Sequence, residues 1–112
     1  MNKYVFFAFK GEMMCFSHVL LNAIDMDSRK MDVKIVIEGE AVKLLEPLIT
    51  SENPLFNKAQ SLGLVDCVCK ACSAKMGVLD YNEKSGVKLC DDLMGHPSMA
   101  SYISDGYQVI TL

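Results

Sequence analysis

Two short apolar runs restrict the fold of this chain more than any other feature of its sequence. Residues Tyr4–Phe9 are apolar throughout, and residues Val33–Ile37 are interrupted only by Lys34. A strand with one face in water alternates between apolar and polar residues, whereas a strand covered by helices on both faces is apolar at nearly every position. We therefore expect both runs to be inner strands of a parallel sheet.

Helical patterns follow each of these runs. Residues 12–28 carry apolar side chains at helical spacing. A short helix then ends at Pro47, and another begins at Asn53 and Pro54, a capping residue followed by a proline at the first helical position. The first half of the chain thus alternates between strands and helices.

The second half continues this alternation. The predicted segments are a third strand at Leu64–Cys69, a helix at Ala71–Tyr81, a fourth strand at Val87–Cys90, a last helix from Pro97 with Met99, Ala100 and Ile103 facing inward, and a final strand at Gln108–Leu112. Strands that alternate with helices are joined by right-handed crossovers into a parallel sheet. We expect residues 1–112 to form a single α/β domain with three layers, in which helices flank a mainly parallel five-stranded sheet.

The charge of the chain excludes one broad class of partner. Eleven basic and 14 acidic residues give a net charge of −3, and the basic residues form no block. A nucleic-acid binder carries a basic patch, so we expect no nucleic-acid partner. The apolar run at Tyr4–Phe9 is interrupted by charged residues before it reaches the length of a signal-peptide core or a membrane span. We expect a cytoplasmic protein without a membrane partner.

Three of the five cysteines lie close together, at Cys67, Cys69 and Cys72. In open α/β sheets, sites form beyond the carboxyl ends of the strands, where Cys69 is expected. Cys72 then falls in the first turn of the next helix, whose free N–H groups stabilise a thiolate and lower a thiol pKa. We expect Cys69 to be the most acidic and most accessible of the five thiols, and Cys67 to be a buried packing residue.

The pair Cys69-Lys-Ala-Cys72 has a spacing that fits a reversible dithiol as well as half of a metal site. The candidates for the other half of a zinc site are Cys67, Cys15, Cys90, His18 and His96. None of them forms a second C-x-x-C or H-x₃-H pair, which closed zinc sites usually contain. The spacing alone does not separate a dithiol from half of a metal site. We expect no bound metal and no organic cofactor, and we keep a metal-binding or purely packed cysteine cluster as the alternative.

Three further residues are candidates for an accessory role. His96 follows the fourth predicted strand and can serve as a base or hydrogen-bond partner of a thiol, or can simply precede a helix that begins at Pro97. Cys15 can face the same pocket from the first loop. Lys70 can add positive charge beside the thiols, although a solvated surface lysine is an equal alternative.

The residues from Cys69 to Gly77, reached through a strand and followed by Val78, resemble the central motif of the DsrE/DsrF-like family, which includes sulfur-relay proteins. The resemblance extends to Lys34–Gly39 and to Gly106–Leu112. It implies the α/β fold of that family. It also implies that Cys69, eight positions before the glycine, carries sulfane sulfur as a persulfide.

The second cysteine, Cys72, resembles the subset of that family that has a C-x-x-C pair. The loop Phe9–Glu12 departs from the Gly/Pro-rich loop of the sulfur-relay members, which leaves the partner open. The resemblance implies a sulfur carrier or sulfurtransferase that uses Cys69, with Cys72 as resolving thiol, and with sulfur donor and acceptor proteins or small persulfides as partners. Together with the apolar pair Met13 and Met14, it implies a homo-oligomer, a trimer or hexamer. The alternative is a non-catalytic binding module of the same fold.

Overall fold

The two apolar runs form neighbouring inner strands of the sheet. The computed structural model describes residues 2–112, and in it β1 (Lys3–Ala8) pairs in parallel with β2 (Asp32–Ile37), with Phe6 opposite Ile35. Residues 5–8 and 35–37 are buried. The prediction that helices cover both faces of these strands is confirmed.

The remaining elements follow the predicted alternation of strands and helices. They are α1 (Met13–Ser28), the 3₁₀ helix η1 (Gly39–Leu44), α2 (Leu45–Thr50), α3 (Pro54–Ser61), β3 (Val65–Cys69), α4 (Lys70–Lys75), α5 (Leu79–Glu83), β4 (Leu89–Cys90), α6 (Met99–Ser104) and β5 (Gln108–Thr111). The strand order is β4-β3-β2-β1-β5, and every neighbouring pair is parallel. The predicted single α/β domain with a five-stranded sheet is confirmed, and the sheet is parallel throughout.

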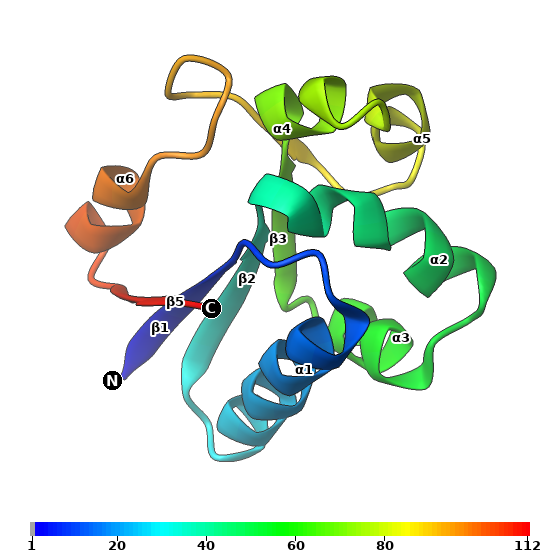
Figure 1. The fold of residues 1–112 in the computed structure, drawn as a ribbon. Helices are drawn as coiled ribbons and strands as arrows, with labels where there is room; N and C mark the ends of the chain where they lie inside the picture. The colour runs from blue at the N-terminus through cyan, green and yellow to red at the C-terminus, as the bar shows by residue number, and fades with distance from the viewer. Residues whose placement is uncertain (1) are drawn as a thin grey trace.

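The strand order explains the three layers. From β1 to β4, each new strand joins the same edge of the growing sheet. Because the crossover connections between parallel strands are right-handed, the helices between these strands lie on one face of the sheet. The last strand returns to the other side of β1, and α6 therefore covers the opposite face. Figure 1 shows α1, α2 and α3 on one side of the sheet and α6 on the other, with α4 and α5 beyond the end of β3.

Each face of the sheet has its own core. The larger core joins the sheet to α1, α2 and α3 and includes Phe16, Leu20 and Phe56. The smaller core lies under α6; its buried members are Val5, Phe7, Val36, Cys67, Cys90 and Tyr107. Helix α6 contributes no buried residue of its own, so this face is the more thinly covered one.

The predicted inward face of the last helix is wrong for Ala100 and Ile103. Ile103 is 58% exposed, Ala100 is also exposed, and Met99 is half-buried against the smaller core. The reason is that Tyr102 takes the inward position, where its ring meets that of Phe7 edge-on at a centroid distance of 5.6 Å. A six-residue helix has room for few such contacts.

Two element boundaries also differ from the prediction. The helix expected at residues 71–81 is divided into α4 and α5, because Gly77 adopts a positive φ of 75° that ends α4. The last helix begins at Met99 and not at Pro97, because the Ser98 side chain caps it by accepting a hydrogen bond from the Ser101 N–H. No helix within residues 2–112 is long and apolar enough to cross a membrane.

Candidate functional site

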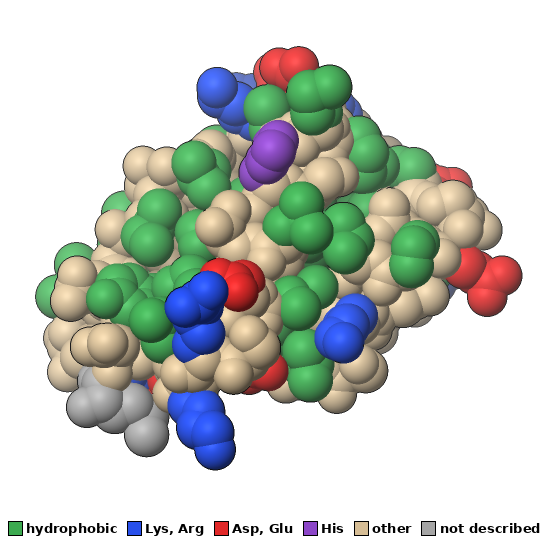
Figure 2. Space-filling model, turned by 90° about the horizontal axis from the view of Figure 1, so that it is seen from below, with side chains coloured by type: hydrophobic (Ala, Val, Ile, Leu, Met, Phe, Trp, Pro, Cys, Tyr) green, Lys and Arg blue, Asp and Glu red, His purple; other side chains and the backbone are tan. Residues whose placement is uncertain are grey.

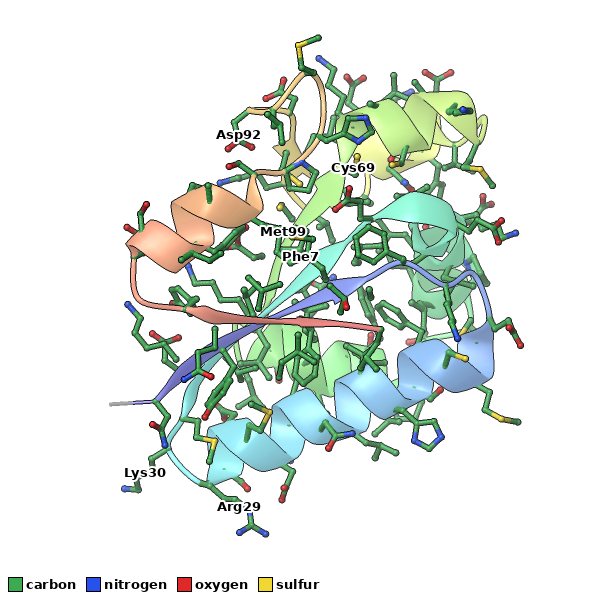
Figure 3. The ribbon with its side chains drawn as sticks, turned by 60° about the vertical axis from the view of Figure 1, so that its left-hand side comes forward. Phe7, Arg29, Lys30, Cys69, Asp92 and Met99 are labelled. Atoms are coloured by element: carbon green, nitrogen blue, oxygen red, sulfur yellow. The ribbon has the colours of Figure 1, made fainter. Side chains whose placement is uncertain are left out.

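Four side chains from three different strand ends meet at one edge of the sheet. Cys69 ends β3, Cys72 lies one turn later in α4, Glu38 directly follows β2, and His96 lies in the loop after β4. Because β2, β3 and β4 are parallel neighbours, their carboxyl ends share this edge. Figure 3 shows Cys69 where β3 passes into α4, with Asp92 of the loop after β4 at the same edge.

The imidazole of His96 lies between the other three groups. Its Nδ1 is 3.2 Å from Cys69 Sγ and 3.6 Å from Cys72 Sγ. The same nitrogen is 3.9 Å from Glu38 Oε1. Each of the four side chains offers one donor atom, and these four atoms all lie within 4.8 Å of one another. Among residues 2–112, this is the cluster of histidine, cysteine and carboxylate groups that can hold a metal ion.

A buried polar network fixes the turn that carries the two cysteines. The Cys72 N–H donates to Cys69 Sγ at 3.3 Å, and Ser73 Oγ donates to the Cys69 carbonyl at 2.6 Å. Asn82 Nδ2 in turn donates to Ser73 Oγ and to the Val42 carbonyl, both at 3.0 Å. Ser73 and Asn82 are fully buried, so the start of α4 is tied to α5 and η1.

The loop that carries His96 is held against α4 by its backbone. Leu93 and His96 exchange two backbone hydrogen bonds of 2.7 and 2.8 Å, and the Ala71 N–H donates to the Gly95 carbonyl at 2.8 Å. Gly95 has a φ of +90°, and a Cβ there would lie 3.0 Å from Ala71 Cβ. The glycine therefore permits both the backbone conformation and the close approach that bring His96 to the thiols.

The prediction that Cys69 is the most acidic and accessible thiol is wrong. Its side chain is fully buried, and burial raises the pKa of the Cys69 thiol to about 12 despite the hydrogen bond from the Cys72 N–H. The loop after β4, which packs over the strand end, is the feature that the prediction lacked. Cys72 is half-buried and is the thiol of this pair that a partner can reach.

Glu38 is the functional candidate that sequence reasoning missed. Burial raises the pKa of its carboxyl group, and His96 partly offsets this effect. Its Oε2 is buried without a hydrogen-bond partner among the described residues. The available signal was its position as the first residue after an inner strand, at the edge where the cysteines were already expected.

Cys67 is a packing residue, as predicted. It is 1% exposed and lies in the smaller core with Cys90, and the hydrogen bond from the Cys90 thiol is the main cause that lowers its pKa. Its Sγ is also 3.6 Å from the Tyr102 hydroxyl, which donates to Asp66. Cys67 is therefore not one of the four donors that could hold a metal ion. The alternative prediction, in which Cys67, Cys69 and Cys72 together bind a metal, is wrong in including Cys67.

The other predicted accessory residues lie away from the thiols. Cys15 lines a separate hollow between α1 and the ends of β1 and β5, together with Phe9, Lys10, His18, Thr111 and Leu112. The prediction that Cys15 faces the same pocket is therefore wrong. Lys70 is exposed and pairs with Asp91 at 3.8 Å, as a solvated surface lysine does. Of the three accessory candidates, the structure brings His96 alone to the pair.

Comparison with known proteins gives the chain an archaeal relative. It is 35% identical over 95 residues to the uncharacterized protein MJ0733 of Methanocaldococcus jannaschii, a match that covers 85% of this chain and 78% of the relative. The chain belongs to the same family as MJ0733. It is also 49% identical over 35 residues to an uncharacterized protein of Archaeoglobus fulgidus, which is 31% of this chain and 95% of that protein.

No protein-family model and no solved structure matches the chain. The names of the two archaeal relatives state no activity. The function is therefore argued from the geometry of the site.

Proposed function

We propose that this protein is a sulfur carrier of the DsrE/DsrF-like type, which holds sulfane sulfur as a persulfide on its C-x-x-C pair. The observation that supports this proposal is the unequal burial of two thiols that share one imidazole. Cys72 is half-buried and Cys69 fully buried, and their sulfurs lie 3.6 and 3.2 Å from His96 Nδ1. One thiol is thus open to a partner and the other is shielded.

The entry thiol in this proposal is Cys72, and not Cys69 as the sequence resemblance implies. His96 Nδ1 takes the proton of the Cys72 thiol, and the thiolate attacks the outer sulfur of a donor persulfide. The donor S–S bond breaks, the donor leaves as a thiolate, and Cys72 becomes the persulfide. An acceptor thiolate then attacks the outer sulfur and returns the Cys72 thiolate, so the transfer needs no external oxidant or reductant.

The burial of Cys69 protects this intermediate. Attack of Cys69 on the inner sulfur of the Cys72 persulfide expels hydrogen sulfide and leaves a disulfide, which only a reducing thiol can reset. With the pKa of Cys69 at about 12, little of its thiolate is present near neutral pH. The internal reaction is therefore slow, and the sulfur stays on Cys72 long enough to meet an acceptor.

Exposed apolar side chains support the proposal that the chain binds further copies of itself. Met14 is 75% exposed, Ile103 58% and Leu112 45%. Figure 2 shows apolar side chains over much of the face seen from below, between separated charged groups. We propose a homo-oligomer, a trimer or hexamer, that meets donor and acceptor thiols in the cytoplasm, where reducing conditions keep thiols free.

Peptide mass spectrometry after brief exposure to a polysulfide tests the proposal. We expect the added sulfur on Cys72 in the wild type and its loss in Cys72→Ser, because a serine hydroxyl is a poor nucleophile without a strong base. Cys69→Ser should keep the adduct and prolong its life. Cys15→Ser, which alters a thiol outside the site, is the matched control. Loading that persists in Cys72→Ser and disappears in Cys69→Ser would return the carrier role to Cys69.

A further inference from the structure

We propose that Glu38, Cys69, Cys72 and His96 bind one Zn²⁺ ion. They offer two sulfurs, one imidazole nitrogen and one carboxylate oxygen, all within 4.8 Å of one another. Binding of the metal does not depend on the proposed sulfur chemistry, because it follows from the positions of the four donors alone.

The spacing of the donors fits a tetrahedral ion. Zinc lies about 2.3 Å from sulfur and about 2.0–2.1 Å from nitrogen or oxygen, so tetrahedral ligand atoms are about 3.3–3.8 Å apart. His96 Nδ1 is 3.2 Å from Cys69 Sγ, 3.6 Å from Cys72 Sγ and 3.9 Å from Glu38 Oε1. Shifts of a few tenths of an ångström bring these three distances into the tetrahedral range.

Glu38 supplies a second, independent observation. Its side chain is 15% exposed, and its Oε2 is buried with no hydrogen-bond partner among the described residues. The ion pairs found in residues 2–112 give it no lysine or arginine. The lysine and arginine side chains in these pairs have other partners: Arg29 with Asp25, Lys43 with Glu40, Lys34 with Asp66 and Lys70 with Asp91. In the part of the chain that the structure describes, the only basic group beside this carboxylate is the His96 imidazole at 3.9 Å, which offsets the cost of burial only in part. A divalent ion at this place supplies a ligand for the buried oxygen and the remaining positive charge.

The types of donor select the class of metal. Thiolate and imidazole ligands favour zinc and other soft or borderline transition metals, whereas Mg²⁺ and Ca²⁺ prefer a shell of oxygens. The half-buried positions of Cys72 and His96 leave a path for the ion from solvent. Gly95 and the paired backbone of Leu93 and His96 hold the imidazole in place before the metal arrives.

Zinc at this site has a consequence for sulfur transfer, and this part of the inference rests on the proposed function. The metal and the sulfane sulfur compete for the Cys72 sulfur. A bound Zn²⁺ ion occupies the lone pair with which the Cys72 thiolate attacks a donor persulfide. Zinc therefore blocks loading, and removal of zinc restores it.

The metal site is tested with the full chain, reduced and stripped with a chelator. Zn²⁺ is titrated against a chromogenic chelator, and Co²⁺ alone is added as a spectroscopic probe. We expect one Zn²⁺ per chain, together with thiolate-to-cobalt charge-transfer bands and the visible bands of tetrahedral Co²⁺. Cys69→Ser and Cys72→Ser should each remove the charge transfer from one sulfur and weaken binding strongly.

Two variants that each remove one carboxylate distinguish loss of a metal ligand from a general loss of negative charge. Glu38→Gln should weaken zinc binding at least about tenfold, whereas Glu40→Gln, which alters an exposed carboxylate two residues away, should leave it unchanged. His96→Ala changes a loop residue and serves as the variant that tests the site if a cysteine variant fails to fold. Cobalt bands without thiolate character, or zinc affinity equal in the wild type, Glu38→Gln and His96→Ala, would overturn the metal site.

The two proposals fail separately. Sulfur loading of zinc-free protein without any zinc binding would overturn only the metal site. Stoichiometric zinc with no loading of the zinc-free protein would overturn only the sulfur carrier. Loading that proceeds at the same rate with and without one equivalent of zinc would overturn the competition between them.

Discussion

Cys69 and Cys72 differ in access to solvent, and the roles proposed for the two residues rest on this difference. Cys69 is fully buried beneath the loop after β4, whereas Cys72 is half-buried in α4. A thiol that must meet a partner needs exposure, and a buried thiol with a raised pKa reacts slowly. In the proposed mechanism, the position of a single loop therefore makes Cys72 the carrier and Cys69 the shielded thiol.

Gly95 is the residue that allows this loop to pack, and its replacement provides a test. Gly95→Ala places a Cβ 3.0 Å from Ala71 Cβ at a φ of +90°. We expect a loss of about 1–3 kcal/mol in the free energy of unfolding from the backbone strain, and a further loss from the contact, with slower sulfur loading because His96 moves.

Gly86→Ala is the matched control for this measurement. Gly86 has a similar φ of +92°, but its added Cβ meets nothing within 4 Å. Urea unfolding of both variants separates backbone strain, which they share, from the contact with Ala71. Equal stability and equal loading in the two variants would mean that the close approach of Gly95 to Ala71 contributes neither to stability nor to the position of His96.

At the scale of the elements, the carboxyl ends of β2, β3 and β4 bring together residues that are far apart in the chain. Glu38 and His96 are separated in the chain by η1, four α-helices and two strands, yet they lie on either side of Cys69. The opposite end of the sheet is joined in a different way. There Tyr107, next to β5, donates to Asp32 of β2 at 2.9 Å across β1.

This tyrosine gives the sheet a dependence on alkaline pH. Burial, with the hydrogen bond to Asp32, raises the pKa of Tyr107 to about 12, above the value of about 10 for an unfolded tyrosine. The protonated form is therefore the one that stabilises the fold, fully so below pH about 10, and this stabilisation is lost as pH rises through about 12.

Tyr107→Phe should remove that dependence. We expect the variant to be less stable than the wild type near neutral pH, because Asp32 loses its donor, and the difference to shrink as the pH approaches about 12. Urea unfolding at a series of pH values measures it. A difference between the two proteins that stays constant or grows with pH would contradict the assignment.

At the scale of the whole molecule, the two faces of the sheet are covered unequally. Three helices and η1 cover one face, and the short α6, without a buried residue, covers the other. The exposed Ile103 belongs to α6, which Figure 1 shows on this thinly covered side. A surface of this kind gains most from contact with another copy of the chain.

An aspartate on each side of the molecule tests this assembly. We expect light scattering to give the mass of a trimer or hexamer for the wild type, and a smaller mass for Ile103→Asp. Leu62→Asp, at the end of α3 on the opposite face, is the control. Leu62 is 41% exposed, and this variant should keep the wild-type mass. A monomeric wild type, or dissociation by Leu62→Asp alone, would contradict this choice of surface.

The sequence predicted features that depend on neighbouring residues, and it missed features that depend on contacts between residues far apart in the chain. Continuous apolar runs are local signals, and they correctly gave the inner strands and the edge where Cys69 lies. The burial of Cys69 and the proximity of Glu38 depend on the loop after β4, which folds back through the contact of Gly95 with Ala71. Such contacts between distant residues leave no periodic pattern, so the sequence alone predicted the location of the site better than its chemistry.

The central claim is that His96 accepts the proton of the Cys72 thiol during sulfur loading. The rate of that loading tests the claim most directly. In zinc-free protein near neutral pH, His96→Ala should slow loading of Cys72 by about 100-fold or more, because the thiol loses its proton acceptor. His18→Ala, an exposed histidine on α1 away from the pair, should load at the wild-type rate. Equal rates for the wild type and both variants would contradict the account, because the imidazole would then have no part in the reaction of the thiols.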